Sequence, residues 1–332
     1  MAAPTDLLGP AELEAPVGRR EAIAGRSLGQ LAWARLRRDK VAMTALVVLT
    51  LIVLVAAFAP VVTRAVGVDP LSQHPELLSP EGSLPLGRGG GISLSHPFGV
   101  EPLTGRDNFA RLLYGSRISL LIAFSATAFT CAIGTVVGII AGYSRGIWDT
   151  LLGRLMDLVL AFPLLLLLLS MSSVLTQRLE DLGVPAGNPA RITYLILTIS
   201  VFGWPYLARL VRGQVLSVRE REFVEAAVAE GASTRRILFR EILPNLWAPI
   251  LVYATISLPN FIALEASLSF LGVGILPPEA TWGAMLGDSV RYFTVDPAYL
   301  FIPGTLLFVV VFAFNLLGDA VRDALDPRAG RV

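Results

Sequence analysis

Apolar residues fill this chain in six long blocks, separated by polar segments rich in turn-forming residues. The blocks are uncharged or nearly so, and they cover roughly residues 41–62, 118–143, 155–175, 192–208, 246–275 and 299–321. An α-helix rises about 1.5 Å per residue, so roughly 20 residues cross the hydrocarbon core of a bilayer. Helices also satisfy their own backbone hydrogen bonds in lipid, and the alternation typical of a β-barrel is absent. The pattern therefore predicts an all-α polytopic membrane bundle with about six transmembrane helices.

The fourth block is short, and the fifth contains two prolines, Pro249 and Pro259. Because proline removes a backbone hydrogen bond, the fifth helix is expected to tilt or kink. Residues 1–26 are polar and without periodicity, which is typical of a disordered tail. Residues 27–40 alternate Leu and Trp with Arg and Lys, which predicts a helix along the headgroup layer.

Positive charge is distributed unevenly between the segments that join the blocks. The segments before the first block, between the second and third, between the fourth and fifth, and after the sixth carry 7, 2, 7 and 3 Arg or Lys, and the three opposite segments carry 8 together. Cationic loops stay in the cytoplasm, so both termini are expected there.

The expected division of the chain follows from these blocks and their orientation. It comprises a cytoplasmic tail with an interfacial helix (1–40), a first transmembrane helix (41–62), an extracytoplasmic loop (63–117), a five-helix core (118–321) that contains a cytoplasmic loop (213–245), and a C-terminal cytoplasmic tail (322–332).

Composition excludes several kinds of chemistry. The chain is 54% hydrophobic and 16% charged with a net charge of +1, so no basic field indicates nucleic acid as a partner. Its single cysteine, Cys131, and two histidines exclude an internal disulfide and a His-rich metal cage. Its single lysine, Lys40, follows Asp39, so a phosphate-binding P-loop is missing. No catalytic residue, cofactor or metal is expected in this chain, and no cleaved signal peptide is indicated.

The loop 213–245 has apolar positions at helical spacing, which predicts two short helices. Gly231 separates them, because glycine accepts the left-handed backbone that ends helices. Ser233 or Thr234 follows and can cap the second helix. The loop is therefore expected to form a helix–turn–helix on the cytoplasmic face.

The same loop carries a recognisable motif. Glu225-Ala226-Ala227, then Gly231, then Ile242-Leu243-Pro244 resembles the EAA loop of bacterial binding-protein-dependent importers. Further segments resemble the second permease subunit of the dipeptide, oligopeptide and nickel importers. These segments are 33–43, 96–120, 154–163, 266–286 and 315–328. Residues 75–95 look like an insertion relative to that family.

The resemblance implies a type I ABC importer permease of a bacterial plasma (inner) membrane. Such a subunit forms half of an alternating-access pathway for peptides or similar small solutes. The implied partners are a homologous second permease, two ATPase subunits that bind ATP and Mg, and an extracytoplasmic solute-binding protein. A dipeptide, an oligopeptide or a nickel chelate fits this family equally well as the solute.

In the family, the EAA loop touches the ATPase, which makes the loop the expected coupling site. Small side chains allow close approach to a partner cleft, and a carboxylate can accept from a partner arginine or amide. The expected coupling residues are Glu225, Ala226, Ala227, Gly231 and Ala232. The alternative is an amphipathic hairpin that merely packs against the bundle.

Four further residues are candidates for the pathway or its outer gate: Asp157, Glu265, Trp282 and Met285. A charge inside a span is unfavourable by about 2.5–3.5 kcal/mol, so each acid should face protein, water or a partner. The alternative places Asp157 beside Arg154 near the cytoplasmic face and makes Glu265 a structural clamp. Trp282 could equally anchor a short helix at the outer interface.

Two other functional classes were compared with this interpretation. An intramembrane enzyme would need a nucleophile–base or paired-carboxylate arrangement, and no span contains His or Lys. A self-sufficient secondary transporter or channel is the stronger alternative, since such proteins use intramembrane acids and broken helices.

Overall fold

Long helices that run between two ends of the molecule form the protein. The computed structural model describes residues 28–87, 89–144 and 146–325, and the tail expected at 1–26 lies outside them. The helices are α1 (Leu28–Leu36), α2 (Lys40–Ala57), α3 (Ala59–Val66), the 3₁₀-helix η1 (Pro75–Leu77), α4 (Asn108–Tyr143), α5 (Ile147–Ala161), α6 (Leu164–Asp181), α7 (Asn188–Val218), α8 (Glu222–Ala229), α9 (Thr234–Arg236), the π-helix η2 (Ile237–Ile242), α10 (Leu243–Phe270), α11 (Trp282–Ser289) and α12 (Pro297–Leu325).

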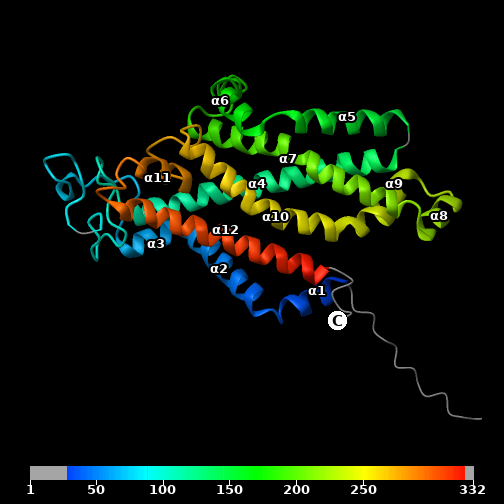
Figure 1. Ribbon diagram of the computed structural model, residues 1–332, viewed down its shortest axis with the longest axis horizontal. Helices are drawn as coiled ribbons and strands as arrows, with labels where there is room; N and C mark the ends of the chain where they lie inside the picture. Colours follow the sequence, from blue (N-terminus) through cyan, green and yellow to red (C-terminus); the bar gives the residue numbers. More distant parts are fainter. Residues whose placement is uncertain (1–27, 88, 145, 326–332) are drawn as a thin grey trace, which may run out of the picture.

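The two ends differ in what they contain. Figure 1 shows α8 and α9 at one end, and α1 and the last turns of α12 lie in the same half of the molecule. The loop of residues 67–107 and α11 lie at the other end. We call these the hairpin end and the loop end. The elements expected on the cytoplasmic side thus share one end, opposite to the loop expected outside.

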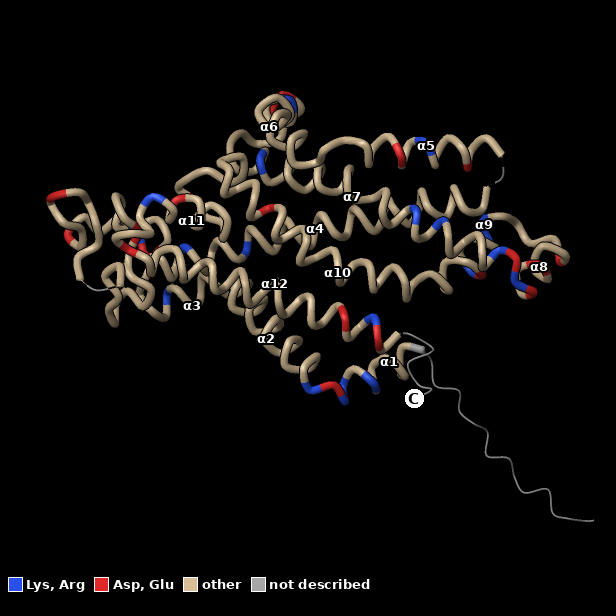
Figure 2. The backbone as a smooth tube through the Cα atoms, in the orientation of Figure 1, with Lys and Arg blue, Asp and Glu red and all other residues tan. Residues whose placement is uncertain are grey.

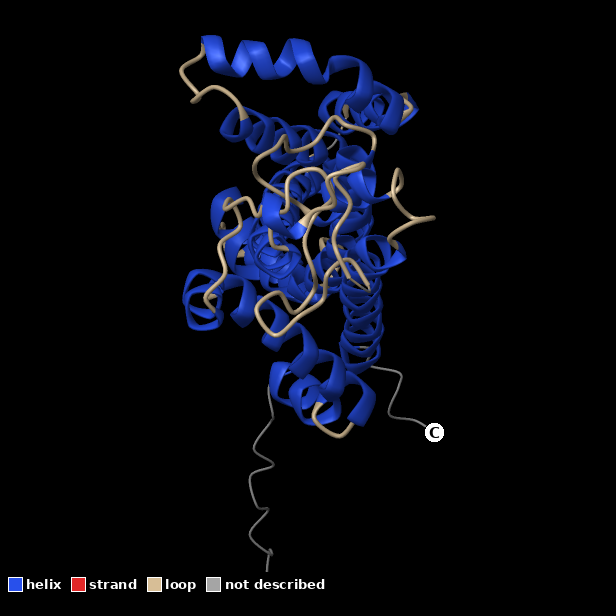
Figure 3. Ribbon diagram, turned by 90° about the vertical axis from the view of Figure 1, so that its left-hand side faces the viewer, coloured by secondary structure: helices blue, strands red, loops and turns tan. Residues whose placement is uncertain are grey.

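The prediction of an all-α bundle with about six transmembrane helices is confirmed. Five described helices are long and apolar enough to cross a membrane, and a sixth is added if the bent pair α5–α6 counts as one span. The part of the chain that the structure describes forms helices and loops without a strand (Figure 3). Acidic and basic residues are most frequent toward the two ends, and fewer of them lie in the middle of the bundle (Figure 2). Such a band suits the hydrocarbon core of a bilayer.

The third apolar block, 155–175, is not one continuous helix. It is divided between α5 and α6, whose axes differ by 84°. Phe162 ends α5 in an extended conformation (φ −76°, ψ 132°), and Pro163 follows it. Proline disfavours helical backbone in the residue before it, which explains the break. A high density of leucine on both sides hides this break when hydropathy alone is considered.

The fifth block behaves differently, although it contains two prolines. A helix runs from Thr234 to Phe270 through α9, η2 and α10, with Pro249 and Pro259 in its interior. The stretch Ile237–Ile242 of this helix is π-helical, and it lies ahead of both prolines. The irregularity therefore marks the junction between the hairpin and the span.

The centre of the bundle is the seam between α4 and α7. Three glycines of α4 recur at every fourth position, Gly134, Gly138 and Gly142. A Cβ at Gly138 would lie 2.7 Å from the carbonyl oxygen of Ala208 and from Cβ of Val211. Small residues at this spacing allow two helix backbones to approach closely in membranes. The seam fixes α4 against α7 along half of its length.

The first span is peripheral. Asp39 caps α2 by accepting from the backbone of Val41 and Ala42 at 2.8 and 3.1 Å. Arg35 of α1 donates to the carbonyl of Ala324 at 3.3 Å, which ties the helix expected in the headgroup layer to the end of α12. The outward face of α2 carries large exposed apolar side chains, as a face in lipid requires.

Candidate functional site

The loop between α7 and α10 forms a compact helical hairpin, residues 219–245. Gly231 follows α8 with φ 75°, so the predicted left-handed position is confirmed. The amide of Ala232 donates to the carbonyl of Ala227 at 3.0 Å and closes the end of α8. Ser233 then accepts from the amide of Arg236 at 3.4 Å and caps α9, as predicted. Local chemistry alone thus determines this turn.

The inner side of the hairpin belongs to the bundle. Val224 and Ala227 of α8 and Ile237 and Ile242 of η2 are buried in one apolar cluster with residues of α7 and α10. Arg219 donates to the carbonyl of Gly142 at 2.9 Å, at the last turn of α4. The hairpin is therefore anchored to α4, α7 and α10 together.

The outer side of the hairpin is exposed and mixed in character. Glu225 and Ala226 are exposed, Ala232 is half-buried, and Glu225 makes no ion pair within the described residues. Three large apolar side chains of the hairpin are also exposed: Phe223 (40%), Val228 (54%) and Phe239 (63%). Exposed apolar groups with a polar surround are typical of a protein-binding surface. The EAA residues thus divide, since Ala227 packs inward and Glu225 and Ala226 face outward.

Asp157 lies on the face of α5 that meets α7. Its carboxylate forms an ion pair with Arg209 of α7, rather than with its neighbour Arg154. About one turn nearer the hairpin end on α7, Arg212 donates two hydrogen bonds to Asp149, of 2.6 and 3.1 Å. These two pairs join α5 to α7 and line a shallow polar groove of about 430 Å³.

The sequence did not single out Asp149, Arg209 or Arg212 as partners of this face. The sequence did contain a signal. Arg209 and Arg212 are three residues apart and share one face of a helix, and Asp149 and Asp157 are eight residues apart and share a face of another. What was missing was the identity of the facing helix.

The other three candidates for a pathway or gate lie together at the loop end. Glu265 is fully buried and accepts from Ser119 at 2.8 Å and from Ser269 at 2.7 Å. The indole of Trp282 donates to Ser116 at 2.9 Å, and its backbone amide donates to Ser119 at 3.4 Å. The network joins α4, α10 and α11.

The cluster of Glu265, Trp282 and Met285 is buried inside the bundle. Trp282 and Met285 are both 0% exposed, which does not fit an aromatic anchor at the lipid interface. A Cβ at Gly283 would lie 2.5 Å from Cα of Ala266, so α11 lies directly on the backbone of α10. The structure therefore separates Asp157 from the other three, and a gate formed by Glu265, Trp282 and Met285 stays a prediction.

A buried ion cluster that the sequence did not reveal holds the loop end together. Glu101 contacts Arg106 at 2.8 Å and Arg111 at 3.2 Å, and it accepts from the Tyr299 hydroxyl at 3.1 Å. Burial, and then the neighbouring Glu101 carboxylate, raise the pKa of the Asp288 carboxyl above its ordinary value. The cluster joins the 67–107 loop to the first turns of α4 and α12.

The start of α4 is fixed by a second interaction of the same loop. Asp107 accepts from the amide of Ala110 at 2.7 Å and contacts the ring of His96 at 2.8 Å. Within the described residues, no group of three or more His, Cys, Asp or Glu side chains is placed to hold a metal ion.

A polytopic bundle with a helical hairpin between α7 and α10 has the fold of an ABC importer permease. It resembles a chain of the inward-facing MetNI methionine ABC transporter with a TM-score of 0.51, covering 66% of this chain and 97% of that one at 22% identity. Residues 134–331 match the family of binding-protein-dependent transport system inner membrane components. Residues 27–80 match the N-terminal transmembrane domain of oligopeptide transport permease C.

Relatives of similar length share more of the sequence. The dipeptide transport system permease protein DppC of Alkalihalophilus pseudofirmus is 39% identical over 90% of this chain and 89% of the relative. The oligopeptide transport system permease protein OppC of Bacillus subtilis is 35% identical over 98% of each chain. The glutathione transport system permease protein GsiD of Escherichia coli is 38% identical over 89% of each. The chain therefore belongs to the binding-protein-dependent transport system inner membrane components and is a permease subunit of an ABC importer.

Proposed function

We propose that this chain forms half of the translocation pathway for a peptide-like solute and is driven by separate ATPase subunits through the 219–245 hairpin. The observation that carries the proposal is the division of the hairpin into two sides. Its inner side is continuous with α7 and α10, and its outer side presents Glu225 among exposed apolar groups. Such an element can receive a push from a partner and pass it to the spans.

The remaining parts of the machine follow from this assignment. A homologous permease supplies the other half of the pathway, and two ATPase subunits bind ATP and Mg at the hairpin end. That end faces the cytoplasm, in agreement with the excess of Arg and Lys in its segments. An extracytoplasmic solute-binding protein docks at the loop end. Peptides are the favoured solute class, because relatives named for dipeptide, oligopeptide and glutathione transport align over most of the chain.

The test uses the complete transporter in vesicles, with two hairpin variants. Gly231→Val is expected to reduce ATP-driven uptake steeply, because a β-branched residue at φ 75° strains the turn. Its matched control is Gly183→Val, since Gly183 also has positive φ (97°) and open space around it but lies in the turn between α6 and α7. Glu225→Ala removes a contact of about 1.5–3 kcal/mol when such a carboxylate is charge-paired with a partner. Its control is Glu81→Ala, in the loop at the opposite end.

Both hairpin variants should still assemble and bind the solute-binding protein, because the spans and the loop end are unchanged. Unstimulated ATP hydrolysis by the partners should persist, and solute uptake should fall. If both variants assemble and transport at the parental rate, the hairpin is not the coupling element. Uptake by the chain without ATPase subunits would instead indicate a self-sufficient transporter.

A further inference from the structure

A large apolar cavity lies beside α4 at the loop end, away from the hairpin and the polar groove. Its volume is about 700 Å³, within the range of about 300–1,000 Å³ common for small-molecule sites. Its walls come from the last turns of α2, the chain just after α3, the first half of α4 and the short segment before α11. The cavity therefore lies between the last turns of the peripheral first span and the first half of α4.

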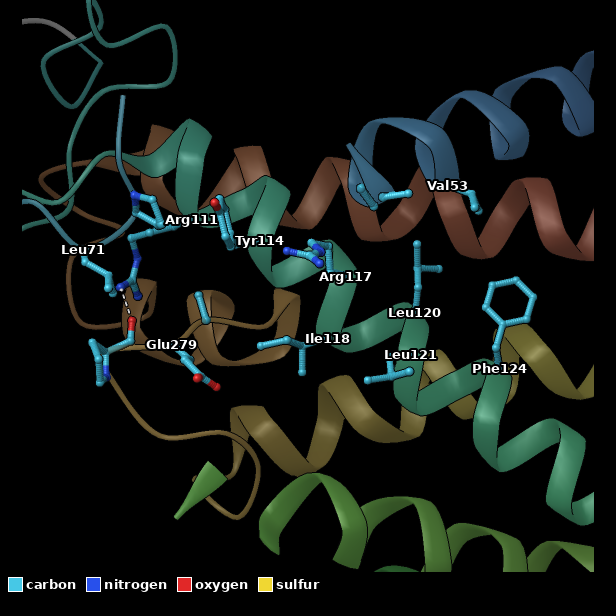
Figure 4. Close-up of a pocket in the computed structure, with 15 residues that line it drawn as sticks. Val53, Leu71, Arg111, Tyr114, Arg117, Ile118, Leu120, Leu121, Phe124 and Glu279 are labelled. Atoms are coloured by element: carbon cyan, nitrogen blue, oxygen red, sulfur yellow. Dashed lines mark hydrogen bonds between the residues drawn. The ribbon is translucent and has the colours of Figure 1, made fainter. Parts of the chain in front are cut away.

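Polarity changes along this cavity in one direction. Figure 4 shows Arg111, Tyr114, Arg117 and Glu279, together with Leu71, toward one side, and only the apolar side chains Val53, Leu120, Leu121 and Phe124 toward the other. Arg117 and Phe124 are seven residues apart on α4, so the gradient extends about 10 Å along the helix axis. The charged side lies toward the loop end, and the apolar side lies toward the middle of the bundle. This is the order of headgroup and acyl chain in one leaflet.

The two arginines of the cavity differ in whether their charge is already neutralised. Arg111 is 1% exposed, pairs with Glu101 and donates to the carbonyl of Pro278 at 3.3 Å. Arg117 is exposed and lies 5.7 Å from the centre of the Tyr114 ring, with no ion pair or hydrogen bond among the described residues. A planar guanidinium carries its N–H groups in a fork that matches the oxygens of a phosphate. Arg117 is thus the free cation at the headgroup level.

The opposite rim supplies the opposite charge. Glu279 lines the same cavity, is exposed, and has no ion-pair or hydrogen-bond partner in the described part of the chain. A purely anionic headgroup would meet this carboxylate unfavourably, whereas a zwitterionic one satisfies both rims. The apolar floor is open to an acyl chain, since Leu121 and Phe124 are 53% and 42% exposed.

We propose that this cavity binds one phosphatidylethanolamine molecule from the leaflet at the loop end. Its phosphate contacts Arg117, its ammonium faces Glu279, and one acyl chain occupies the space between α2 and α4. The lipid completes the contact of the peripheral first span with the core. Binding requires only that the chain spans a membrane, so it is independent of how the hairpin acts.

Native mass spectrometry of the full chain tests the proposal, both purified alone and within the assembled transporter. Palmitoyl-oleoyl phosphatidylethanolamine is added, and the fraction of protein carrying one lipid is measured. Arg117→Gln should weaken that binding roughly tenfold to hundredfold, since a charge-assisted contact is lost. The control Arg178→Gln, at an exposed arginine of α6, should leave it unchanged. Ala57→Trp should also reduce binding, because Ala57 is exposed and lines the cavity.

Three comparisons separate the lipid from other occupants. Phosphatidylglycerol should bind several-fold more weakly than phosphatidylethanolamine, and Glu279→Gln should remove that preference. Inorganic phosphate should not displace the lipid, whereas displacement would make the site one for free phosphate and overturn the proposal. Loss of the lipid on assembly would show that the partner permease covers the cavity and would also overturn it. Equal binding by the parental chain and Arg117→Gln contradicts the role of Arg117 and sinks the assignment.

Discussion

Two helices lie against α7 by different means. α4 meets it through glycines that bring backbone next to backbone, whereas α5 meets it through a small apolar cluster around Met156 and through two ion pairs across a polar groove. The first seam buries Leu207, Val211 and Val215 completely. The second leaves most of α5 exposed, with Trp148 at 60% and Leu158 at 58%. A close-packed seam has one geometry, whereas a seam of half-exposed charges can open and re-form.

This difference suits a transport subunit, in which some helix contacts stay fixed while others change. The hairpin is packed onto α7 and α10 and is hydrogen-bonded to the end of α4 through Arg219, so those helices are expected to move as one body. α5 joins that body through the small cluster around Met156 and, on its polar side, through the two ion pairs. If the pathway opens during transport, the α5–α7 groove is the place where a change requires the least repacking.

The largest expected effect comes from replacing one glycine by alanine in α4 and one in α5, the two helices that lie against α7. Gly138→Ala places Cβ 2.7 Å from the Ala208 carbonyl, so α4 and α7 must separate, at a loss of about 1–3 kcal/mol. Gly153→Ala on α5 meets nothing within 4 Å and should gain about 0.5–1 kcal/mol from helix propensity. Thermal unfolding of the purified complexes measures both. Equal shifts of the same sign would show that the seams do not differ.

The contrast also explains what the sequence could and could not predict. The hairpin follows from signals a few residues apart, and its turn at Gly231 and cap at Ser233 were predicted correctly. The six apolar blocks predicted the bundle because hydropathy alone decides which segments enter lipid. The break at Phe162 and Pro163 was missed, although proline is a local signal, because the leucines around it dominate the hydropathy.

Long-range pairing could not be inferred in the same way. Gly134, Gly138 and Gly142 are visible as a four-residue repeat, yet nothing local identifies α7 as the partner helix. Asp157 and Glu265 look alike in sequence, as single acids in apolar surroundings. In the structure, Asp157 pairs with an arginine of α7, whereas Glu265 accepts from two serine hydroxyls, one on α4 and one on α10. Ser269 is only four residues from Glu265, but Arg209 and Ser119 are 52 and 146 residues from their partners, and such distances leave no periodic trace.

The next effect concerns the stronger of the two ion pairs. Asp149→Asn removes the charge that holds Arg212 by two hydrogen bonds, and both side chains are about one-third exposed. The loss is expected to be about 1 kcal/mol, reduced from the value for buried pairs by water screening. The exchanged pair Asp149→Arg with Arg212→Asp should recover most of it. Failure of the exchange to recover stability would mean that Asp149 acts through something other than this pair.

The smallest expected effect is that of Asp157→Asn on stability, and its dependence on salt distinguishes the two seams. Asp157 and Arg209 are 56% and 47% exposed, so Asp157→Asn should change the unfolding free energy by only about 0–1 kcal/mol. Raising the ionic strength from about 0.1 M to about 1 M shortens the Debye length from roughly 10 Å to roughly 3 Å. The difference between the parental chain and Asp157→Asn should therefore shrink in high salt, whereas that between the parental chain and Gly138→Ala should not. Thermal unfolding at both salt concentrations, with Gly138→Ala measured in parallel, gives the comparison. A salt-independent effect of Asp157→Asn would mean that the groove between α5 and α7 is closed to water, and the two seams would then be rigid alike.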